Sequence, residues 1–320
     1  MQGTAIAQPN IALIKYWGKR NTKRNLPAVG SISITLRELF TRMHVKFDAS
    51  LAADTLIVNG TPDNAMLPRL ASCLDRIAGP DRHRARIASD CNFPIAAGLA
   101  SSASAFAAIT VAAAAAAGKE FGQDSLASLA GQGSGSAARS LFGGFVELKN
   151  MDDDIRCATI LDAAAWPLSV IVAITEKGPK AVGSTEAMDI SRRTSPFYSA
   201  WIEQQDEDLA TARAAIARRD FEQLAAISEH NCLKMHSIMW ASRPPLVYWN
   251  AATLRCLETL RHLQRQGLGV FFTIDAGPQV KAVCLPEHAG EVADALRGTA
   301  GVTELMTTGL GEGARLENTA

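Results

Sequence analysis

The stretch NFPIAAGLASSASAF, residues 92–106, lies in a segment from Cys91 to Gly118 that contains no Asp, Glu, Lys or Arg. A segment of that length could cross a membrane, but a spanning helix needs about 20 strongly apolar residues, and this one is rich in Ala and interrupted by Pro94 and several Ser. Ala favours helix, and its small side chain lets neighbouring backbones approach closely. We therefore expect a helix over residues 101–117 that is packed on all sides inside a soluble globular domain, not a membrane span.

The beginning of that helix is a candidate anion site. Gly98 permits an unusual backbone angle, and Ser101 and Ser102 open the helix. The free N–H groups and the dipole at a helix start attract anions, and Ser hydroxyls add donors for a phosphate. An ordinary Ser N-cap before a buried helix explains these residues equally well at this point. The segment contains neither the GK[ST] of a Walker A loop nor a GxGxxG turn.

Length and composition set broad limits. The chain has 320 residues, of which 32 are basic, 32 acidic and 48% hydrophobic, as is typical of a globular protein large enough for two lobes. The balanced charge gives no reason to expect nucleic acid as a partner. The N-terminal residues lack the pattern of a secretory signal. Six scattered Cys without a CxxC pair favour free thiols in the cytoplasm, and the His spacing does not indicate a zinc site.

The order of the remaining elements predicts an α+β chain with two lobes, 1–165 and 166–320. Before residue 165 we expect strands over 5–14, 31–36, 41–48, 54–58, 84–93 and 145–150, a hairpin turn at 59–60, helices over 66–78, 101–117 and 124–131, and another helix beginning within 134–142. After residue 165 we expect strands over 168–175 and 302–310, helices over 199–218, 220–239, 250–266 and 287–298, and two strands within 270–285 broken at Gly277.

Two further stretches place cations among small or aromatic residues. The first, 14-IKYWGKR-20, could form the edge of a pocket for an anionic substrate, and the alternative is a solvated basic turn with buried aromatics. The second, 133-GSGSAARSLFGG-144, surrounds Arg139 with small residues, and the planar fork of Arg suits a carboxylate or a phosphate. The alternative is a surface Arg on a tight turn, although no other charge lies between Asp124 and Glu147.

A carboxylate stands in the apolar stretch 270-VFFTIDAGPQVKAV-283. Asp275 interrupts residues that otherwise read as buried strands, next to a Gly-Pro turn. A buried carboxylate is unfavourable unless it is paired, and such positions are enriched in catalytic acids and bases. The alternative at this point is an Asp that caps a turn.

Taken together, these stretches resemble the diphosphomevalonate decarboxylases of the GHMP kinase superfamily. The resemblance runs through nearly the whole chain in nine segments that follow the family's order and spacing: NIALIKYWGKR, SISITL, DTLIVNG, NFPIAAGLASSAS, GSGSAARSLFGG, TSPFY, HNCLKMH, RPPLVYW and TIDAGPQVK. It implies the GHMP two-lobe fold, with an N-terminal lobe like ribosomal protein S5 domain 2, a ferredoxin-like C-terminal lobe and the active site in the cleft between them.

The resemblance also implies an activity. ATP and (R)-5-diphosphomevalonate would give isopentenyl diphosphate, ADP, phosphate and CO₂, with Mg²⁺ accompanying ATP. The family is usually a homodimer that acts in isoprenoid synthesis. Asp275 matches the carboxylate near the hydroxyl on carbon 3, where it can orient that group or accept its proton. Arg139 matches the Arg that holds the substrate carboxylate, Lys15 the Lys near the transferring phosphoryl group, and Asn10 a supporting Asn.

By the same resemblance, two sets of residues would bind the reactants, and the ligands of Mg²⁺ stay open. Those that would bind the phosphorylated mevalonate are Tyr16, Trp17, Gly18, Lys19, Arg69, Ser134, Gly135, Ser136, Ala137, Ala138, Arg139, Ser184 and Thr185. Those that would bind ATP are Gly98, Leu99, Ala100, Ser101, Ser102 and Ser104. We interpret Met235, His236 and Tyr248 as packing and turn residues.

The chain departs from the family pattern at two places. Gly183-Ser184 stands where the family often has Ser-Ser, and Ala138 stands where a Cys is common. The first departure bears on the terminal phosphate of the substrate, so the nearest alternative is a phosphomevalonate decarboxylase that makes isopentenyl phosphate. The others are a mevalonate-type 3-kinase that does not decarboxylate and a non-catalytic binding member of the superfamily. The joint presence of Lys15, Arg139 and Asp275 favours the decarboxylase.

Overall fold

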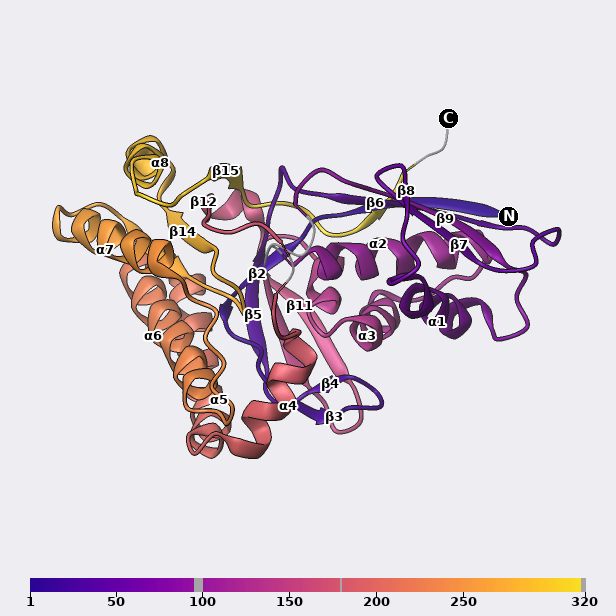
Figure 1. Cartoon of the computed structure of the whole chain (residues 1–320), viewed down its shortest axis with the longest axis horizontal. Helices are drawn as coiled ribbons and strands as arrows, with labels where there is room; N and C mark the ends of the chain where they lie inside the picture. Colours follow the sequence, from indigo (N-terminus) through magenta and orange to yellow (C-terminus); the bar gives the residue numbers. More distant parts are fainter. Residues whose placement is uncertain (95–99, 179, 318–320) are drawn as a thin grey trace.

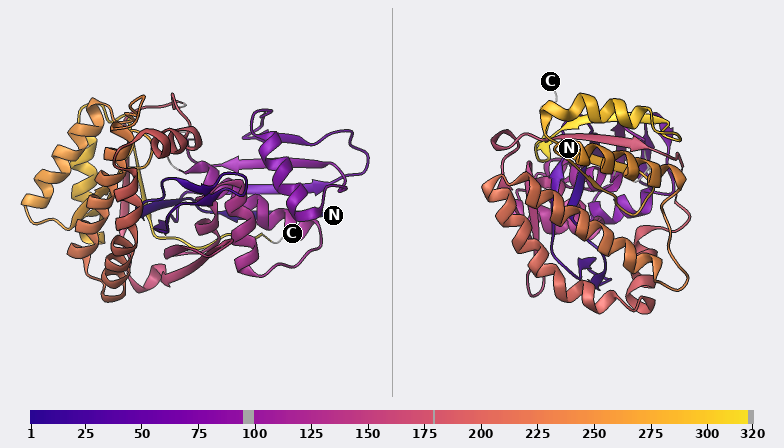
Figure 2. Two further views of the ribbon diagram at one scale, coloured as in Figure 1. Left: turned by 90° about the horizontal axis from the view of Figure 1, so that it is seen from below. Right: turned by 90° about the vertical axis from the view of Figure 1, so that its left-hand side faces the viewer.

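The computed structural model describes residues 1–94, 100–178 and 180–317 of the chain. Two residues expected to bind ATP, Gly98 and Leu99, lie outside these ranges. The chain forms two lobes that follow one another along the long axis of the molecule (Figures 1 and 2). Mainly antiparallel sheets and separate helices make up both lobes, which is the predicted α+β class.

The first lobe is built on a larger and a smaller sheet. The larger sheet has the order β16-β1-β6-β9-β7-β8, in which β7 and β9 run parallel and the other neighbours antiparallel. The smaller sheet has the order β11-β10-β5-β2, and β3 pairs with β4 in a separate hairpin. The strands are β1 (Gln2–Ala7), β2 (Asn10–Ile14), β3 (Lys19–Asn21), β4 (Leu26–Pro27), β5 (Ser31–Thr35), β6 (Thr41–Phe47), β7 (Thr55–Val58), β8 (Thr61–Pro62), β9 (Ala85–Cys91), β10 (Phe145–Asn150), β11 (Ile155–Leu161) and β16 (Arg315–Leu316).

Helix α2 (Ser101–Ala116) is the predicted Ala-rich helix, and it lies buried in the first lobe. It packs on β1 and β6 and against helices α1 (Leu67–Ala78) and α3 (Gln123–Gly133) (Figure 1). The contact with the sheet is close, because a Cβ atom added to Gly3 would lie 2.4 Å from the carbonyl oxygen of Ala112. Small side chains on both sides make this approach possible. Across the described ranges, none of the helices combines the length and apolar content that a membrane crossing requires.

The second lobe places helices against a sheet of order β13-β14-β12-β15. In Figure 2 these helices form one end of the molecule. The strands are β12 (Ser169–Ile174), β13 (Val270–Thr273), β14 (Val280–Cys284) and β15 (Glu304–Gly309). The helices are α4 (Ser184–Thr194), α5 (Tyr198–Arg218), α6 (Phe221–Trp240), α7 (Ala251–Arg265) and α8 (Ala289–Arg297). Short 3₁₀ helices are η1 (Ala137–Leu141) in the first lobe, η2 (Ala163–Ala165) between the lobes and η3 (Pro286–His288) in the second.

The sheet of the second lobe is buried on both faces, which explains the uninterrupted apolar run of β12. Ile171 packs with residues of α6, α7 and α8, whereas Val170 and Val172 pack with residues of β2 and β5 from the first lobe. Thr273 Oγ1 also donates to the carbonyl oxygen of Ala12 at 3.1 Å and so joins β13 to β2. One apolar cluster therefore spans the two lobes and brings the ends of β2 and β13 together.

Local chemistry explains where the structure differs from the expected elements. The expected strand over 5–14 is two strands, β1 and β2, interrupted at Gln8 and Pro9, since Pro has no N–H to donate to a ladder. The helix expected within 134–142 is only the short η1. The hairpin turn at 59–60 joins β7 to β8 as predicted. The elements that the sequence did not predict are β3, β4, β11, η2, α4 and β16.

The last described residues of the chain return to the first lobe. The N–H of Glu312 donates to Gln8 Oε1 at 2.7 Å, and the N–H of Ala314 donates to the carbonyl oxygen of Ser140 in η1 at 3.0 Å. Strand β16 then pairs with β1 and completes the larger sheet. The C-terminal segment thus holds η1, the short helix that carries Arg139, against the sheets.

Candidate active site

A cavity of about 660 Å³ lies where the two lobes meet, and its wall contains residues from both. Sixteen residues singled out from the sequence line it: Asn10, Lys15, Tyr16, Trp17, Lys19, Arg69, Ala100, Ser101, Ser102, Ser134, Gly135, Ser136, Arg139, Ser184, Thr185 and Asp275. The residues that lie buried behind this wall are Gly18, Ser104, Ala137 and Ala138. The wall also includes Lys23, Lys180 and Met235, none of which was assigned to the site from the sequence.

An ion pair between the lobes forms the centre of the cavity wall. Lys15 follows β2, and its Nζ lies 2.7 Å from Asp275 Oδ1 at the end of β13. Lys281 of β14 reaches the other oxygen, with its Nζ 3.3 Å from Asp275 Oδ2. The Lys15 side chain is 1% exposed and that of Asp275 is 27% exposed, and both residues line the cavity. Asp275 therefore pairs with two lysines and does not cap a turn.

The electrostatics of this ion pair favour the ionised carboxylate. Burial alone raises the pKa of the Asp275 carboxyl, but the charges and hydrogen bonds of Lys15 and Lys281 outweigh burial and hold that pKa well below its usual range. Asp275 is therefore a hydrogen-bond acceptor and a weak base at neutral pH.

Arg139 is buried, so the alternative of a surface Arg on a tight turn is wrong. Its Nε donates to Ser33 Oγ at 3.0 Å, and its Nη2 donates to Asn10 Oδ1 at 3.1 Å. Asn10 in turn donates through Nδ2 to Ser140 Oγ at 2.8 Å. Burial lowers the pKa of the Arg139 guanidinium from its ordinary value. The network fixes the plane of the guanidinium at the cavity wall, where it could hold a carboxylate or a phosphate.

The segment after β2 is not a solvated basic turn. Trp17 is buried among apolar residues, and its carbonyl oxygen accepts from Trp201 Nε1 at 3.1 Å. The hydroxyl of Tyr16 is buried with no hydrogen-bond partner among the described residues, and burial raises its pKa. A Cβ atom on Gly135 would lie 2.6 Å from that hydroxyl, so only Gly leaves room for it. The Tyr16 hydroxyl is thus a donor at the cavity wall that a bound ligand could satisfy.

Cations gather at the end of the cavity nearest the β3–β4 hairpin. Lys19 Nζ donates to Thr185 Oγ1 of α4 at 3.1 Å, which joins the hairpin of the first lobe to the second lobe. Burial, and then the charge of Arg69, lower the pKa of Lys19. Lys180 Nζ donates to Ser184 Oγ at 3.0 Å, and burial lowers its pKa too. Closely spaced cations are suited to a polyanionic ligand.

The Ser-rich helix start lies at the same cavity. Ala100 precedes α2 with φ 54° and ψ 35°, a left-handed conformation, and its methyl group cannot cap the helix. Ser101 and Ser102 are the first helical residues and line the cavity, so an ordinary Ser N-cap does not describe them. Ser104 is fully buried one turn further on and shares a hydrogen bond of 2.7 Å with Thr41 Oγ1. The first turn of α2 therefore directs Ser hydroxyls and the helix dipole to the cavity.

Helix α6 holds both halves of the central ion pair, a role that the sequence did not reveal. Asn231 Oδ1 accepts from the N–H of Lys15 at 2.7 Å. The next residue, Cys232, bonds the peptide of Ile274, whose N–H lies 3.2 Å and whose carbonyl oxygen lies 3.4 Å from its Sγ. Because Ile274 directly precedes Asp275, adjacent side chains of one helix position the backbones of both ionic partners.

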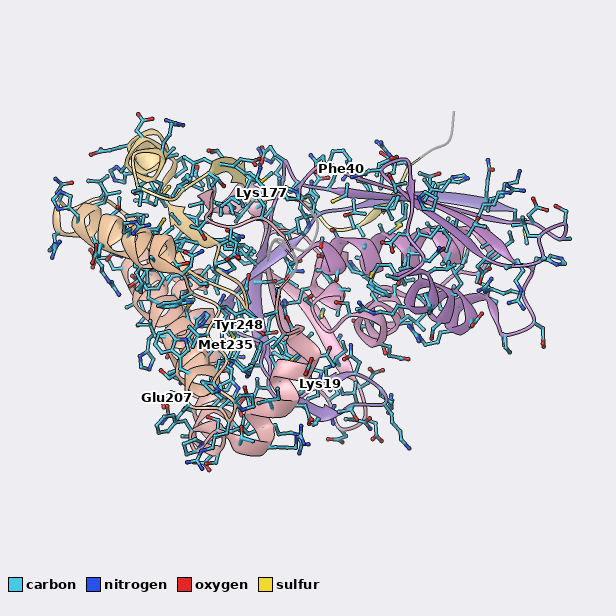
Figure 3. All side chains as sticks on the ribbon, in the orientation of Figure 1. Lys19, Phe40, Lys177, Glu207, Met235 and Tyr248 are labelled. Carbon is cyan, nitrogen blue, oxygen red and sulfur yellow. The ribbon has the colours of Figure 1, made fainter. Side chains whose placement is uncertain are left out.

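Three residues interpreted as packing lie on the same side of the cavity. His236 is fully buried, its Nε2 is 3.2 Å from the carbonyl oxygen of Ile274, and its ring lies 4.7 Å from that of Trp249. Tyr248 donates to the carbonyl oxygen of Val182 at 2.9 Å and holds the segment before α4. Met235 packs in an apolar cluster as expected and also lines the cavity. Figure 3 shows Met235 and Tyr248 beside the helices of the second lobe, with Lys19 across from them on the hairpin.

The family models divide the chain in the same order as its lobes. The model described as the diphosphomevalonate decarboxylase-like N-terminal domain matches residues 7–159. The model described as the mevalonate 5-diphosphate decarboxylase C-terminal domain matches residues 170–313. Between them they cover most of the first lobe, most of the second, and every catalytic candidate named above.

Relatives and solved structures agree with these matches. The diphosphomevalonate decarboxylase of Ganoderma lucidum is 34% identical over 92% of this chain and 80% of its own length. The structure of mevalonate diphosphate decarboxylase from Staphylococcus aureus has a TM-score of 0.93 and 34% identity over 99% of this chain and 98% of its own. A structure described as MDDEF in complex with MVAPP, AMPPCP and magnesium has a TM-score of 0.92 and 33% identity over 100% and 99% of the two chains. With this fold and this cavity, the chain belongs to the diphosphomevalonate decarboxylase family of the GHMP kinase fold.

Proposed function

We propose that the protein converts (R)-5-diphosphomevalonate and ATP to isopentenyl diphosphate, ADP, phosphate and CO₂. The observation that carries this proposal is the placement of Asp275, Lys15 and Arg139 on the wall of one cavity whose far end is rich in cations. An ionised acceptor, a phosphoryl-stabilising ammonium and a carboxylate-binding guanidinium are the groups that this reaction needs. The relatives in this family are named for the same activity.

The first step transfers a phosphoryl group. Asp275 accepts a hydrogen bond from the hydroxyl on carbon 3 and orients its oxygen toward the terminal phosphorus of ATP. As the new P–O bond forms, the bond to the bridging oxygen breaks and ADP leaves with the electron pair. The transition state of such a transfer is loose, so a weak base suffices, and Asp275 takes the hydroxyl proton late. Lys15 offsets the negative charge on the transferring group.

The second step releases CO₂. The bond between carbons 1 and 2 breaks, its electron pair forms the double bond between carbons 2 and 3, and phosphate leaves from carbon 3. Arg139 holds the substrate carboxylate, and Asn10, Ser31 and Ser33 fix its guanidinium through hydrogen bonds. A guanidinium that is fixed before the substrate binds aligns the breaking C–C bond with the leaving phosphate.

Two regions of the cavity fit the phosphates. The substrate diphosphate would bind Lys19, Arg69 and the hydroxyls of Ser184 and Thr185, with Tyr16 and the segment 134–138 beside it. ATP would place its phosphates at the first turn of α2, against Ser101 and Ser102. The alternative substrate with a single phosphate would use fewer of these cations.

The cavity also fits Mg²⁺ bound to ATP. Among the described residues no group of three or more His, Cys, Asp or Glu side chains could enclose a metal ion. A magnesium ion that keeps several waters and is carried largely by phosphate oxygens needs only one or two protein oxygens, and Ser101 and Ser102 could supply them. The ion would neutralise phosphate charge during transfer.

A single assay tests the activity and the substrate. Purified protein is incubated with ATP and Mg²⁺ and either mevalonate, 5-phosphomevalonate or 5-diphosphomevalonate, and CO₂ release is measured together with ADP formation. We expect CO₂ and ADP in equal amounts from 5-diphosphomevalonate. If CO₂ is released preferentially from 5-phosphomevalonate, that compound would replace 5-diphosphomevalonate as the proposed substrate. ADP without CO₂ would identify a 3-kinase, and neither product from any substrate would reject the enzyme assignment.

We further propose a cytoplasmic homodimer that acts in isoprenoid biosynthesis, with lobes dividing at residues 165 and 166. The six cysteines are free thiols, which suits a reducing compartment. The gap between the two matched family models, 160–169, contains the proposed boundary. Exposed apolar side chains on α6 and α7, those of Leu233, Trp240 and Leu254, supply a surface that a second copy could cover. Light scattering at assay concentration checks the dimer, and a monomeric mass would reject it.

A further inference from the structure

Lys281 is a fully buried cation whose position the fold alone does not require. It lies in the middle of β14, and its side chain is 0% exposed. Its neighbour on the same face of the strand, Val283, packs in the apolar cluster between the lobes, and its cross-strand partner Val172 does too. Burial lowers the pKa of Lys281, as expected for an ammonium in such surroundings. An apolar side chain of similar length would pack there without loss of hydration.

The ammonium of Lys281 has a functional partner. Its Nζ lies 3.3 Å from Oδ2 of Asp275, while Lys15 occupies Oδ1 at 2.7 Å. Lys15 and Asp275 line the cavity, whereas Lys281 lies behind it on the strand. With both oxygens paired, the plane of the carboxylate is fixed, and its remaining lone pairs are directed to the cavity.

From this geometry we infer that Lys281 is a positioning residue for the reaction: it holds Oδ2 of Asp275 from behind, fixes the carboxylate plane and keeps it ionised toward the substrate hydroxyl. Lys281 does not line the cavity and acts on the reaction through Asp275. The inference rests on the proposed role of Asp275 in the reaction, but the pairing itself does not.

The surroundings of Asp275 make Lys281 the cation with the largest effect after Lys15. The ionisable groups that face the carboxylate from the elements packed around it are Lys15 after β2, Lys281 of β14, Lys180 before α4, Arg139 of η1, and Cys232 and His236 of α6. Burial raises the pKa of Asp275, and the charges of Lys15 and Lys281 are the main effects that lower it. Removal of Lys281 leaves burial opposed chiefly by one lysine, so the pKa of Asp275 must rise.

The test compares Lys281→Met, which keeps length and packing, with Lys281→Gln, which keeps a donor without the charge. We expect kcat for CO₂ release to fall about 10-fold to 100-fold in both variants, with KM for both reactants within about threefold, because a misplaced reacting group lowers the rate more than it lowers binding. Arg82→Met is the matched control, because Arg82 is a buried cation 2.7 Å from Asp54 in the first lobe, outside the cavity wall. We expect that variant to keep its kcat.

A second readout measures the carboxylate directly. Protein labelled with ¹³C at the aspartate carboxyls is titrated by NMR, and the Asp275 signal is assigned by its loss in Asp275→Asn. We expect the pKa of Asp275 to be about 1 to 3 units higher in Lys281→Met than in the unaltered protein. A merely structural lysine would lower stability without this change. An unchanged Asp275 pKa, or a kcat within twofold of the unaltered protein, would overturn the inference.

A third comparison keeps the inference testable if Lys281→Met folds poorly. In the double variant Asp275→Asn/Lys281→Met the contact between the two residues is absent from both sides, so we expect its loss in thermal midpoint to be smaller than the sum of the two single losses. Strictly additive losses would show that the two residues are not coupled and would overturn the pairing. If the unaltered enzyme releases no CO₂ from any substrate, the proposed function fails, while the NMR titration and the double variant still decide whether Lys281 controls Asp275.

Discussion

Lys15 Nζ lies 2.7 Å from Asp275 Oδ1, although 260 positions separate the two residues in the chain. Lys15 directly follows strand β2 of the first lobe, and Asp275 follows strand β13 of the second. The pair can therefore form only when the lobes are packed through their shared apolar cluster. Because Lys15 and Lys281 are both buried and both pair with Asp275, loss of the carboxylate leaves unpaired ammonium groups at the lobe interface.

Asp275→Asn tests the central acceptor. The amide is close in shape but cannot take the hydroxyl proton, so we expect CO₂ release to fall by about 10³-fold or more while ATP still binds. Two buried lysines lose their counter-ion, and the free energy of unfolding should fall by about 3 kcal/mol or more. Steady-state kinetics, calorimetry with ATP and denaturant unfolding measure the three effects. Near-normal product formation would reject the role of Asp275.

Arg139→Lys tests the need for a planar fork. One ammonium cannot replace the bonds to Asn10, Ser31 and Ser33 and also hold the substrate carboxylate. We expect kcat/KM for the mevalonate substrate to fall by about 100-fold, since small misplacements of a reacting group have effects of that size. If steady-state kinetics are unchanged, the guanidinium geometry does not matter to the reaction.

Thr185→Val removes the hydroxyl that Lys19 binds across the cavity. The Lys19 ammonium then loses a partner at 3.1 Å and its fixed position at the diphosphate end. We expect KM for 5-diphosphomevalonate to rise by about 10-fold, the size of a hydrogen bond to a charged group, with a smaller change in kcat. Thr185→Ser keeps the hydroxyl and serves as control. Equal KM values for the Val and Ser variants would contradict a role for this contact.

Asn231→Leu tests how α6 supports the site. The substitution preserves size but leaves the N–H of Lys15 and the carboxylate of Asp208 without their bonds to Asn231, at 2.7 and 2.6 Å. We expect the free energy of unfolding to fall by about 1–3 kcal/mol for each buried group left unsatisfied, together with a lower kcat. Denaturant unfolding and kinetics check both. His230→Leu, one residue earlier and exposed, should stay within about 0.5 kcal/mol.

The buried His236 gives the protein a defined acid sensitivity. Burial lowers the pKa of His236 to about 3 in the folded protein, whereas an unfolded His has a pKa of about 6.5. Between pH 3 and pH 6.5 the unfolded chain binds a proton at His236 that the folded protein does not bind. The contribution of His236 to the free energy of unfolding is therefore fully present above pH 6.5 and is lost as the pH falls toward 3.

The size of this effect can be measured by difference. From pH 6.5 to pH 5, His236 should remove about 2 kcal/mol from the free energy of unfolding. The His236→Gln variant has no imidazole to protonate at this position, so its free energy of unfolding should fall less over the same pH range. Denaturant unfolding of both proteins at pH 7 and pH 5 provides the comparison, and parallel pH dependences would show that His236 does not titrate in this window.

Sequence patterns predicted the elements whose signal is local. The Ala-rich run between Pro94 and Gly118 predicted a buried helix, and α2 occupies it. The lone charges Arg139 and Asp275 stood out because their neighbours are small or apolar, and both line the cavity. The roles given to them came from the family resemblance and stay predictions until the variants are measured.

The missed features depend on contacts between distant elements. In a strand of alternating side chains a single Lys is usually an outward-facing residue, so Lys281 gave no signal that its face is buried. Asn231 gave none either, because its partner Lys15 lies 216 positions away. Helix α4 was missed because it buries few apolar side chains, chiefly Ala187 and Met188, and is otherwise rich in Ser, Thr and charged residues.

The returning C-terminal segment also determines the order in which the protein can mature during translation. Strand β1 gains its outer neighbour only after Arg315 and Leu316 have been synthesised, and the backbone of Ser140, next to Arg139, gains its bond from Ala314 at the same moment. The first lobe therefore cannot complete its larger sheet until the C-terminal segment has been synthesised. A stop codon in place of Gly311 would remove both β16 and the bond from Ala314, and so would damage the part of the enzyme that was made first.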